Sequence, residues 1–308
     1  MSTEADLGTA SRITWADLPP DIRESTERIL GGRVIEARSQ TQGFSPGTAD
    51  RVRTDQGRRA FVKAVTPALN ERSAELARQE LRITAALPEQ APTPRVLGGF
   101  DTGDWIVLVL EDITGEHPRL PWSEADLDTV VAGLDELAAV LTPSPLNDVP
   151  RAADTLAHDF EGWDRIAADP PADLDPWARA HLPALRAAAA RGLAAMASGE
   201  TLTHCDIRAD NILVRDDGRP IFIDWPWGCI GPAWLDRVLL AVNVLVNGGT
   251  ADRLLTGLDP RVVTDVITGL TGFFLHVCRT PPPPGIPAVR AFQRAQGDAL
   301  LPWIRERG

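Results

Sequence analysis

The chain has 308 residues, about twice the length of a common domain, so two domains or two large lobes are expected. Hydrophobic residues at 44% and charged residues at 24% provide for a substantial core and exclude general disorder. The 31 basic and 43 acidic residues give a net charge of −12, which disfavours nucleic acid and anionic membranes as partners. The same charge is compatible with a cationic small molecule.

The three cysteines indicate a reducing compartment. None of the three, Cys205, Cys229 and Cys278, forms a C-x-x-C motif with another. Three cysteines also cannot all form disulfide bonds within one chain. The first residues include acids where a signal peptide carries lysines, and no apolar run approaches about 18 residues. We therefore expect a cytoplasmic protein.

The first third of the chain predicts a small α+β lobe. A helix over 20–30 ends at a glycine pair, and a three-stranded meander follows within 33–65. Helical spacing over 70–87 ends at Pro88, and two further strands are predicted at 95–97 and 105–110. Five strands with one inserted helix give a lobe that we assign to residues 1–113.

The remainder, residues 114–308, predicts a larger and mainly helical lobe. Long apolar-periodic segments cover 127–141, 182–196, 234–246 and 262–277. One β-like interruption occurs at 212–224, where two short apolar runs flank Asp217-Gly218. This pattern is typical of a β-hairpin.

The hairpin carries the strongest chemical signal. Asn211 precedes its first strand and Asp224 follows its second, so antiparallel pairing brings an amide oxygen and a carboxylate to the open end. Such oxygens suit Mg²⁺. Asp206 lies on the loop leading into the same end, separate from the two ligands, as a base for a hydroxyl needs to be. His204, Asp206 and Asn211 are also residue types that often cap turns. The gathering of these three with Asp224 around one hairpin favours a functional site.

The motif His204-x-Asp206-x-x-x-x-Asn211, followed by Ile223-Asp224, resembles the catalytic loop and metal segment of the protein-kinase-like fold, in its aminoglycoside phosphotransferase branch. The resemblance implies that Asp206 positions or deprotonates the acceptor hydroxyl, and that Asn211 and Asp224 hold Mg²⁺ against the nucleotide phosphates. It implies a supporting role for His204. Arg208 stands where protein kinases carry a lysine near the transferred phosphate, and a surface cation is an equal alternative for it. Asp236 resembles an aspartate that stabilises the lobe.

The resemblance also implies a lysine and glutamate pair in the first lobe. Strand periodicity places Lys63 on the same face as Phe61 and Val65, where a lysine needs an anion. Glu80 shares its helix face with apolar residues and is expected to point inward. We predict a Lys63–Glu80 pair that serves the α and β phosphates.

Two further segments are assigned to the nucleotide. Gly43 and Ser45 lie between the first two predicted strands, where a kinase carries its phosphate-covering loop, although the sequence departs from G-x-G-x-x-G. A plain hairpin loop explains this segment equally well. The segment from Glu111 to Ile113 resembles the hinge whose backbone meets adenine. The side chains of Glu111 and Asp112 are not required for that role.

The predicted function is transfer of the γ-phosphoryl group of ATP or GTP, with Mg²⁺, to a hydroxyl of a small molecule such as an aminoglycoside-like antibiotic or a metabolite. Asp159, Glu161 and Asp164 are candidate groups for a cationic acceptor, and solvated helix faces explain them equally well. Two alternatives remain open: a catalytically silent nucleotide-binding module, and a metal-dependent hydrolase that uses His204, Asp206 and Asp224.

Overall fold

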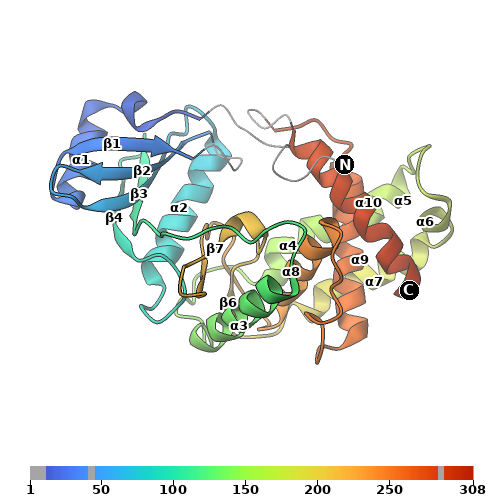
Figure 1. Ribbon diagram of the computed structural model, residues 1–308. Coiled ribbons are helices and arrows are strands. Elements are labelled where there is room, and N and C mark those ends of the chain that lie inside the picture. The colour runs from blue at the N-terminus through green and yellow to red at the C-terminus, as the bar shows by residue number, and fades with distance from the viewer. Residues whose placement is uncertain (1–11, 41–45, 284–287, 308) are drawn as a thin grey trace.

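The protein folds into two lobes, a sheet-containing N-terminal lobe and a helical C-terminal lobe (Figure 1). The computed structural model describes residues 12–40, 46–283 and 288–307. The N-terminal lobe contains η2 (Trp15–Asp17), α1 (Pro20–Leu30), β1 (Val34–Ser39), β2 (Thr48–Thr54), β3 (Arg59–Val65), α2 (Glu71–Ala86), β4 (Val96–Asp101) and β5 (Ile106–Leu110). The predicted five strands and inserted helix are therefore confirmed.

The C-terminal lobe is larger and mainly helical, as predicted. Its helices are α3 (Glu124–Val140), α4 (Ala152–Phe160), α5 (Gly162–Ala168), α6 (Pro176–Ala180), α7 (Leu182–Ala195), α8 (Leu235–Val246), α9 (Pro260–Val277) and α10 (Val289–Arg307), with the short turn η3 (Ala209–Asn211). Its strands are β6 (Thr201–Thr203), β7 (Ile212–Val214), β8 (Pro220–Phe222) and β9 (Cys229–Gly231). Among the described residues no helix is long and apolar enough to cross a membrane.

The five-stranded sheet is antiparallel, with strand order β1-β2-β3-β5-β4. Its period of two separates two faces. Val62 of β3 is buried in a cluster with residues of α1 and with Val107 and Val109 of β5. The opposite face carries Lys63, which pairs across the sheet with Ala49 of β2 and Leu108 of β5. This second face looks toward α2 and the C-terminal lobe.

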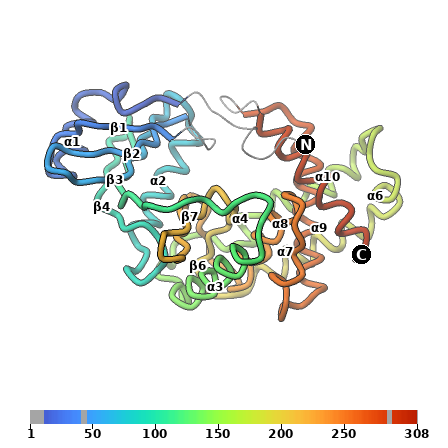
Figure 2. The backbone as a smooth tube through the Cα atoms, viewed as in Figure 1, coloured from blue at the N-terminus to red at the C-terminus, as the bar shows by residue number. Residues whose placement is uncertain are grey.

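The chain passes from sheet to helices after β5 and runs along the C-terminal lobe to α3, as Figure 2 shows. Helix α2 also contacts the C-terminal lobe, because Ile83 is fully buried in a cluster with Phe222, Trp225 and Leu240. A second large cluster joins α4, α5, α7, α8, α9 and α10. The packing fixes α2 between the two lobes.

Several boundaries differ from the sequence prediction. The first apolar run of the predicted meander, Val34-Ile35, extends to Ser39 in β1 through alternating charged residues. The predicted strand at 95–97 corresponds to β4, which continues to Asp101 through two glycines. Periodicity gave no signal for α10, whose Pro302 and polar residues interrupt the apolar pattern. The β6–β9 pair was also missed, since three-residue strands that pair over a long separation leave no local pattern.

Candidate active site

The predicted hairpin is present and brings Asn211 beside the start of the metal segment. β7 and β8 pair in the register Ile212↔Phe222, and Ile223 N–H donates to the Asn211 carbonyl at 2.9 Å. The pairing therefore continues one residue beyond the strands to the position just before Asp224. The turn at the closed end contains Gly218 with φ +81°, a conformation that favours glycine.

Lys63 lies between two carboxylates. Its Nζ is 2.6 Å from Glu80 Oε1 and 2.5 Å from Asp224 Oδ1, so residues of β3, α2 and the metal segment meet at one ammonium group. Burial opposes the charge on Asp224, but the Lys63 ammonium outweighs it and lowers the pKa of Asp224. Burial raises the pKa of Glu80 despite the same ammonium, while the two carboxylates raise the pKa of Lys63 against the effect of burial. The predicted Lys63–Glu80 contact is thus present, and Asp224 joins it.

His204 is fully buried beneath the loop and both of its ring nitrogens are engaged. Nε2 donates to the Ile223 carbonyl at 2.8 Å, and Nδ1 accepts the Asp206 N–H at 3.2 Å. Burial lowers the pKa of His204, which keeps the imidazole neutral. The ring also contacts Trp225 with centroids 4.6 Å apart. His204 therefore ties the loop to the metal segment.

The turn at Cys205 depends on Asp236. Cys205 has φ +63°, an uncommon conformation for a residue with a side chain. Asp236 accepts the His204 N–H at 2.8 Å and the Cys205 N–H at 2.9 Å, and the Asp236 residue is only 8% exposed. A hydrogen bond with Cys229 and burial raise the pKa of the Cys205 thiol, which disfavours a nucleophilic role.

Removing the Asp236 carboxylate is expected to weaken this turn. Asp236→Ala leaves two buried N–H groups without an acceptor, and each costs about 1–3 kcal/mol. We expect a loss of about 2–4 kcal/mol in the free energy of unfolding, measured by urea denaturation. An unchanged unfolding midpoint would remove Asp236 from the support of the loop.

Asp206 lies at the tip of this loop and is held by Asn211. Asn211 Nδ2 donates to the Asp206 carbonyl at 2.8 Å and to Asp206 Oδ2 at 3.1 Å. This fixes the Asn211 amide so that its Oδ1 points away from Asp206. Burial raises the pKa of Asp206 to about 6, although Arg208 opposes the shift. Asp206 is therefore more basic than an exposed aspartate.

Arg208 is paired within the loop. Its Nε and Nη2 bind the two carboxylate oxygens of Asp210 at 3.0 and 2.8 Å, and its Nε is 3.9 Å from Asp206 Oδ1. The guanidinium also lies 5.9 Å from the ring centroid of Phe292 on α10. Arg208 thus places a positive charge beside Asp206 and joins the loop to the last helix.

The segment after β5 is anchored by side chains that sequence reasoning left without a role. Asp112 is almost fully buried and accepts from Arg51 Nε at 2.6 Å and Arg59 Nε at 2.9 Å. Glu111 accepts from Arg95 at 3.2 Å and from Arg215 of the C-terminal lobe at 3.1 Å. The two carboxylates fix the connection between the lobes.

Two backbone groups in this segment, the Glu111 carbonyl and the Ile113 N–H, are available to a ligand. The Glu111 N–H donates to the Arg95 carbonyl and the Ile113 carbonyl accepts from Arg51. Within the described part of the chain, no protein group pairs with the Glu111 carbonyl or the Ile113 N–H. A carbonyl and an N–H two residues apart suit the donor and acceptor edge of a purine.

Most of the candidate catalytic and nucleotide-binding residues line one cleft of about 1080 Å³. The N-terminal lobe contributes Lys63, Glu80 and the segment 111–113, and the C-terminal lobe contributes Asp206, Arg208, Asn211 and Asp224. Arg12, which the sequence did not single out, also lines this cleft; burial lowers its pKa against the attraction of Asp224 and Asp50. Gly43 and Ser45 lie outside the described residues.

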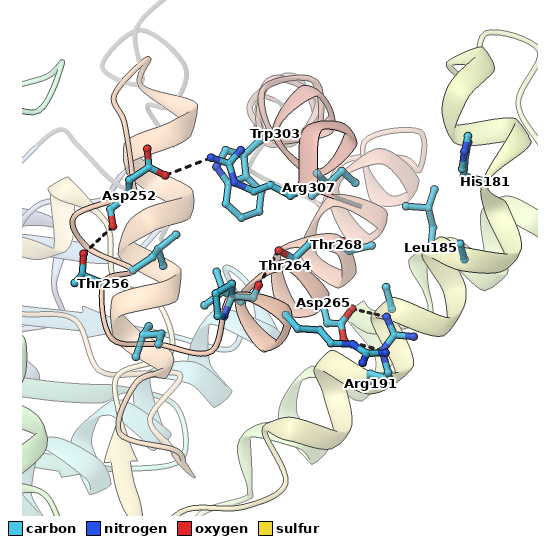
Figure 3. A pocket seen from close by; sticks show the side chains of 18 of the residues that line it. His181, Leu185, Arg191, Asp252, Thr256, Thr264, Asp265, Thr268, Trp303 and Arg307 are labelled. Atoms are coloured by element: carbon cyan, nitrogen blue, oxygen red, sulfur yellow. Dashed lines mark hydrogen bonds and ion pairs between the residues drawn. The ribbon is translucent and has the colours of Figure 1, made fainter.

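A second cavity of about 750 Å³ lies in the C-terminal lobe (Figure 3). Four of its charged side chains form two pairs: Arg191 binds Asp265 through both carboxylate oxygens at 2.8 and 2.6 Å, and Arg307 binds Asp252 at 3.3 Å. It shares no lining residue with the first cleft. The candidate catalytic residues Asp206 and Arg208 line the first cleft and not this cavity.

Three solved structures with a similar fold carry the names of phosphotransferases or kinases. An aminoglycoside phosphotransferase from Alicyclobacillus acidocaldarius has a TM-score of 0.56 at 15% identity, over 94% of this chain and 96% of that one. Aminoglycoside phosphotransferase APH(4)-Ia has a TM-score of 0.61 at 13% identity, over 93% and 98%. A putative fructosamine-3-kinase from Haemophilus somnus has a TM-score of 0.55 at 12% identity, over 91% and 96%. These similarities show a common fold.

No curated protein matches the sequence. Residues 41–262 match the phosphotransferase enzyme family, and this span covers more than half of the chain and includes Lys63, Glu80 and the whole segment 204–236. The fold agrees with that match. The chain therefore belongs to the phosphotransferase enzyme family.

Proposed function

We propose that this protein transfers the γ-phosphoryl group of ATP or GTP to a hydroxyl group of a small molecule. The observation that carries the proposal is the meeting of Lys63, Glu80 and Asp224 in the same cleft as Asp206 and Asn211. In this assignment residues 1–113 bind the nucleotide, and residues 114–308 supply the catalytic groups and the acceptor site. The open backbone pair at Glu111 and Ile113 supports placing the purine at the hinge.

The chemistry requires little from the protein beyond positioning and electrostatics. The acceptor oxygen attacks the γ-phosphorus, the bond to the β–γ bridging oxygen breaks, and the nucleoside diphosphate leaves. Asp206 accepts the hydroxyl proton, and its pKa of about 6 suits a base at neutral pH. Lys63 and Arg208 hold positive charge near the phosphates.

The residues present fit Mg²⁺. Asn211 Oδ1 and the second oxygen of Asp224 are hard ligands, and neither has a donor among the described residues. These two side chains would hold the ion, which when bound neutralises phosphate charge. A hydrolase that uses His204 as a ligand is disfavoured, because both ring nitrogens of His204 are engaged by backbone groups.

The test is consumption of ATP and GTP, with Mg²⁺, across hydroxylated antibiotics and metabolites. One solved structure of APH(4)-Ia is a ternary complex with ADP and hygromycin B, so that compound belongs in the panel. Consumption that requires both an acceptor and Asp206 supports the proposal. Nucleotide binding without transfer to any acceptor would favour the silent binding module.

The metal assignment gives a separate prediction. Asp224→Asn removes one charged ligand and weakens the pairing with Lys63, so we expect about a tenfold or greater rise in the Mg²⁺ concentration that half-saturates activity. Mg²⁺ titrations at saturating nucleotide measure this. Asp216→Asn, on the exposed turn of the same hairpin, is the control with the same change of charge. Equal Mg²⁺ dependence in both variants would remove Asp224 from the metal site.

A further inference from the structure

The part of the cleft beyond Asp206 has an apolar wall. Helix α9 contributes Leu270, Phe273 and Phe274, and α10 contributes Val289 and Phe292. The Arg208 guanidinium lies 5.9 Å from the Phe292 ring centroid, so this wall begins directly beside the catalytic loop.

Two more helices continue the same surface. Leu156 of α4 and Leu239 and Val242 of α8 also line the cleft. Of the thirteen residues that α4, α8, α9 and α10 contribute to the described lining, eight are apolar and one, Asp159, is charged. A wall of this composition favours an acceptor with an apolar body, because burying apolar surface away from water is favourable.

The other two candidate carboxylates do not face this space. Glu161 pairs with Arg165 at 2.6 Å, and Asp164 pairs with Arg186 at 2.5 Å. Neither residue lines the cleft. Along the wall formed by α4, α8, α9 and α10, a compound with several ammonium groups would meet one carboxylate, Asp159, and otherwise uncharged side chains, which is unfavourable unless each charge is paired.

Asp159 differs from those two carboxylates because it has no partner. Within the described residues its carboxylate makes no hydrogen bond and no ion pair. Burial raises the pKa of Asp159 to about 6, against the attraction of His158 and Arg165. A half-buried carboxylate that lines a cleft without a protein donor is suited to one cationic group of a ligand.

Gln296 of α10 provides a second unpaired group in the same lining. The residue is 6% exposed, and its Oε1 is buried without a donor among the described residues. A buried amide oxygen without a donor costs free energy, and a ligand N–H or O–H in the cleft would satisfy it.

We propose that the acceptor is a hydroxyl compound with an apolar body and a single basic amine, held by Asp159 and by Gln296. This inference rests on the proposed phosphotransfer and concerns the acceptor end of the same cleft. It separates the protein from phosphotransferases that act on polycationic aminoglycosides.

The test is calorimetric binding to the full-length protein saturated with Mg²⁺ and AMP-PNP. The probes are propranolol within a panel of apolar hydroxylated monoamines, its uncharged N-acetyl analogue, and hygromycin B as a polycation. We expect the best monoamine to bind at least about tenfold more tightly than the N-acetyl analogue and hygromycin B. Tighter binding of hygromycin B, or no binding of any monoamine to the nucleotide-bound protein, overturns the inference.

Matched variants identify the recognising groups. Asp159→Asn is expected to lower the affinity for the best monoamine about tenfold and to leave the affinity for the N-acetyl analogue unchanged. Glu161→Gln, an exposed position two residues away, is the control and should change neither affinity. Gln296→Leu removes the unpaired amide and is expected to weaken binding without loss of stability. Equal affinities in Asp159→Asn and the parent protein contradict the proposal. Failure to bind AMP-PNP at all would instead count against the proposed function.

Discussion

Asp206→Asn is expected to abolish turnover and to stabilise the protein at neutral pH. The amide cannot accept the hydroxyl proton, so we expect kcat to fall by about 10²–10⁴ while nucleotide affinity stays measurable. The amide also removes a charge that burial disfavours, because the pKa of Asp206 rises from 3.8 to about 6 in the folded protein. Since its side chain is 29% exposed, we expect a gain of about 2 kcal/mol in the free energy of unfolding.

The pH dependence distinguishes this gain from a change in packing. In the parent protein the cost of ionising Asp206 is absent below the unfolded pKa of 3.8, grows as pH rises, and is complete above about 6. The stability difference between Asp206→Asn and the parent should therefore be small near pH 4 and largest near pH 7, by thermal unfolding. A gain that is equal at both pH values, or that also occurs in Asp216→Asn, would show that the buried charge is not its source.

Much of the catalytic end of the cleft could be predicted because its spacing is local. Asn211 and Asp224 flank one hairpin, and the period of two in β3 and the helical period in α2 turn Lys63 and Glu80 toward each other. Short-range geometry of this kind is encoded in consecutive residues. It does not fix the contact of Lys63 with Asp224, which are 161 positions apart.

The proposed acceptor end could not be predicted, because its residues come from segments that are far apart in the sequence. Its lining comes from α4, α8, α9 and α10, whose relative positions are set by packing in the core of the C-terminal lobe. The sequence offered three acids, Asp159, Glu161 and Asp164, as equal candidates. Only tertiary structure separates Asp159, which lines the cleft, from the two that pair with arginines. The anchoring role of the hinge carboxylates was not predicted either, because Asp112 contacts Arg51 and Arg59 only in the folded sheet.

Lys63→Met is expected to lower both the affinity for the nucleotide and the free energy of unfolding. Loss of the ammonium group removes charge-assisted contacts to phosphate, so we expect nucleotide affinity to fall about tenfold or more. It also leaves Glu80 and Asp224 without their shared cation. Removing one partner of a buried pair costs about 3–5 kcal/mol, and we expect about 2–3 kcal/mol because Lys63 and Asp224 are 26% and 40% exposed.

A second substitution tests whether the lost stability comes from the buried carboxylate. Glu80 is 7% exposed, so its unpaired charge is the larger penalty, and Lys63→Met/Glu80→Gln should recover part of the stability in urea denaturation. Nucleotide affinity should not recover, because the glutamine restores no positive charge. A double variant that is less stable than Lys63→Met, or that binds nucleotide as the parent does, would mean that Lys63 acts through its packing alone.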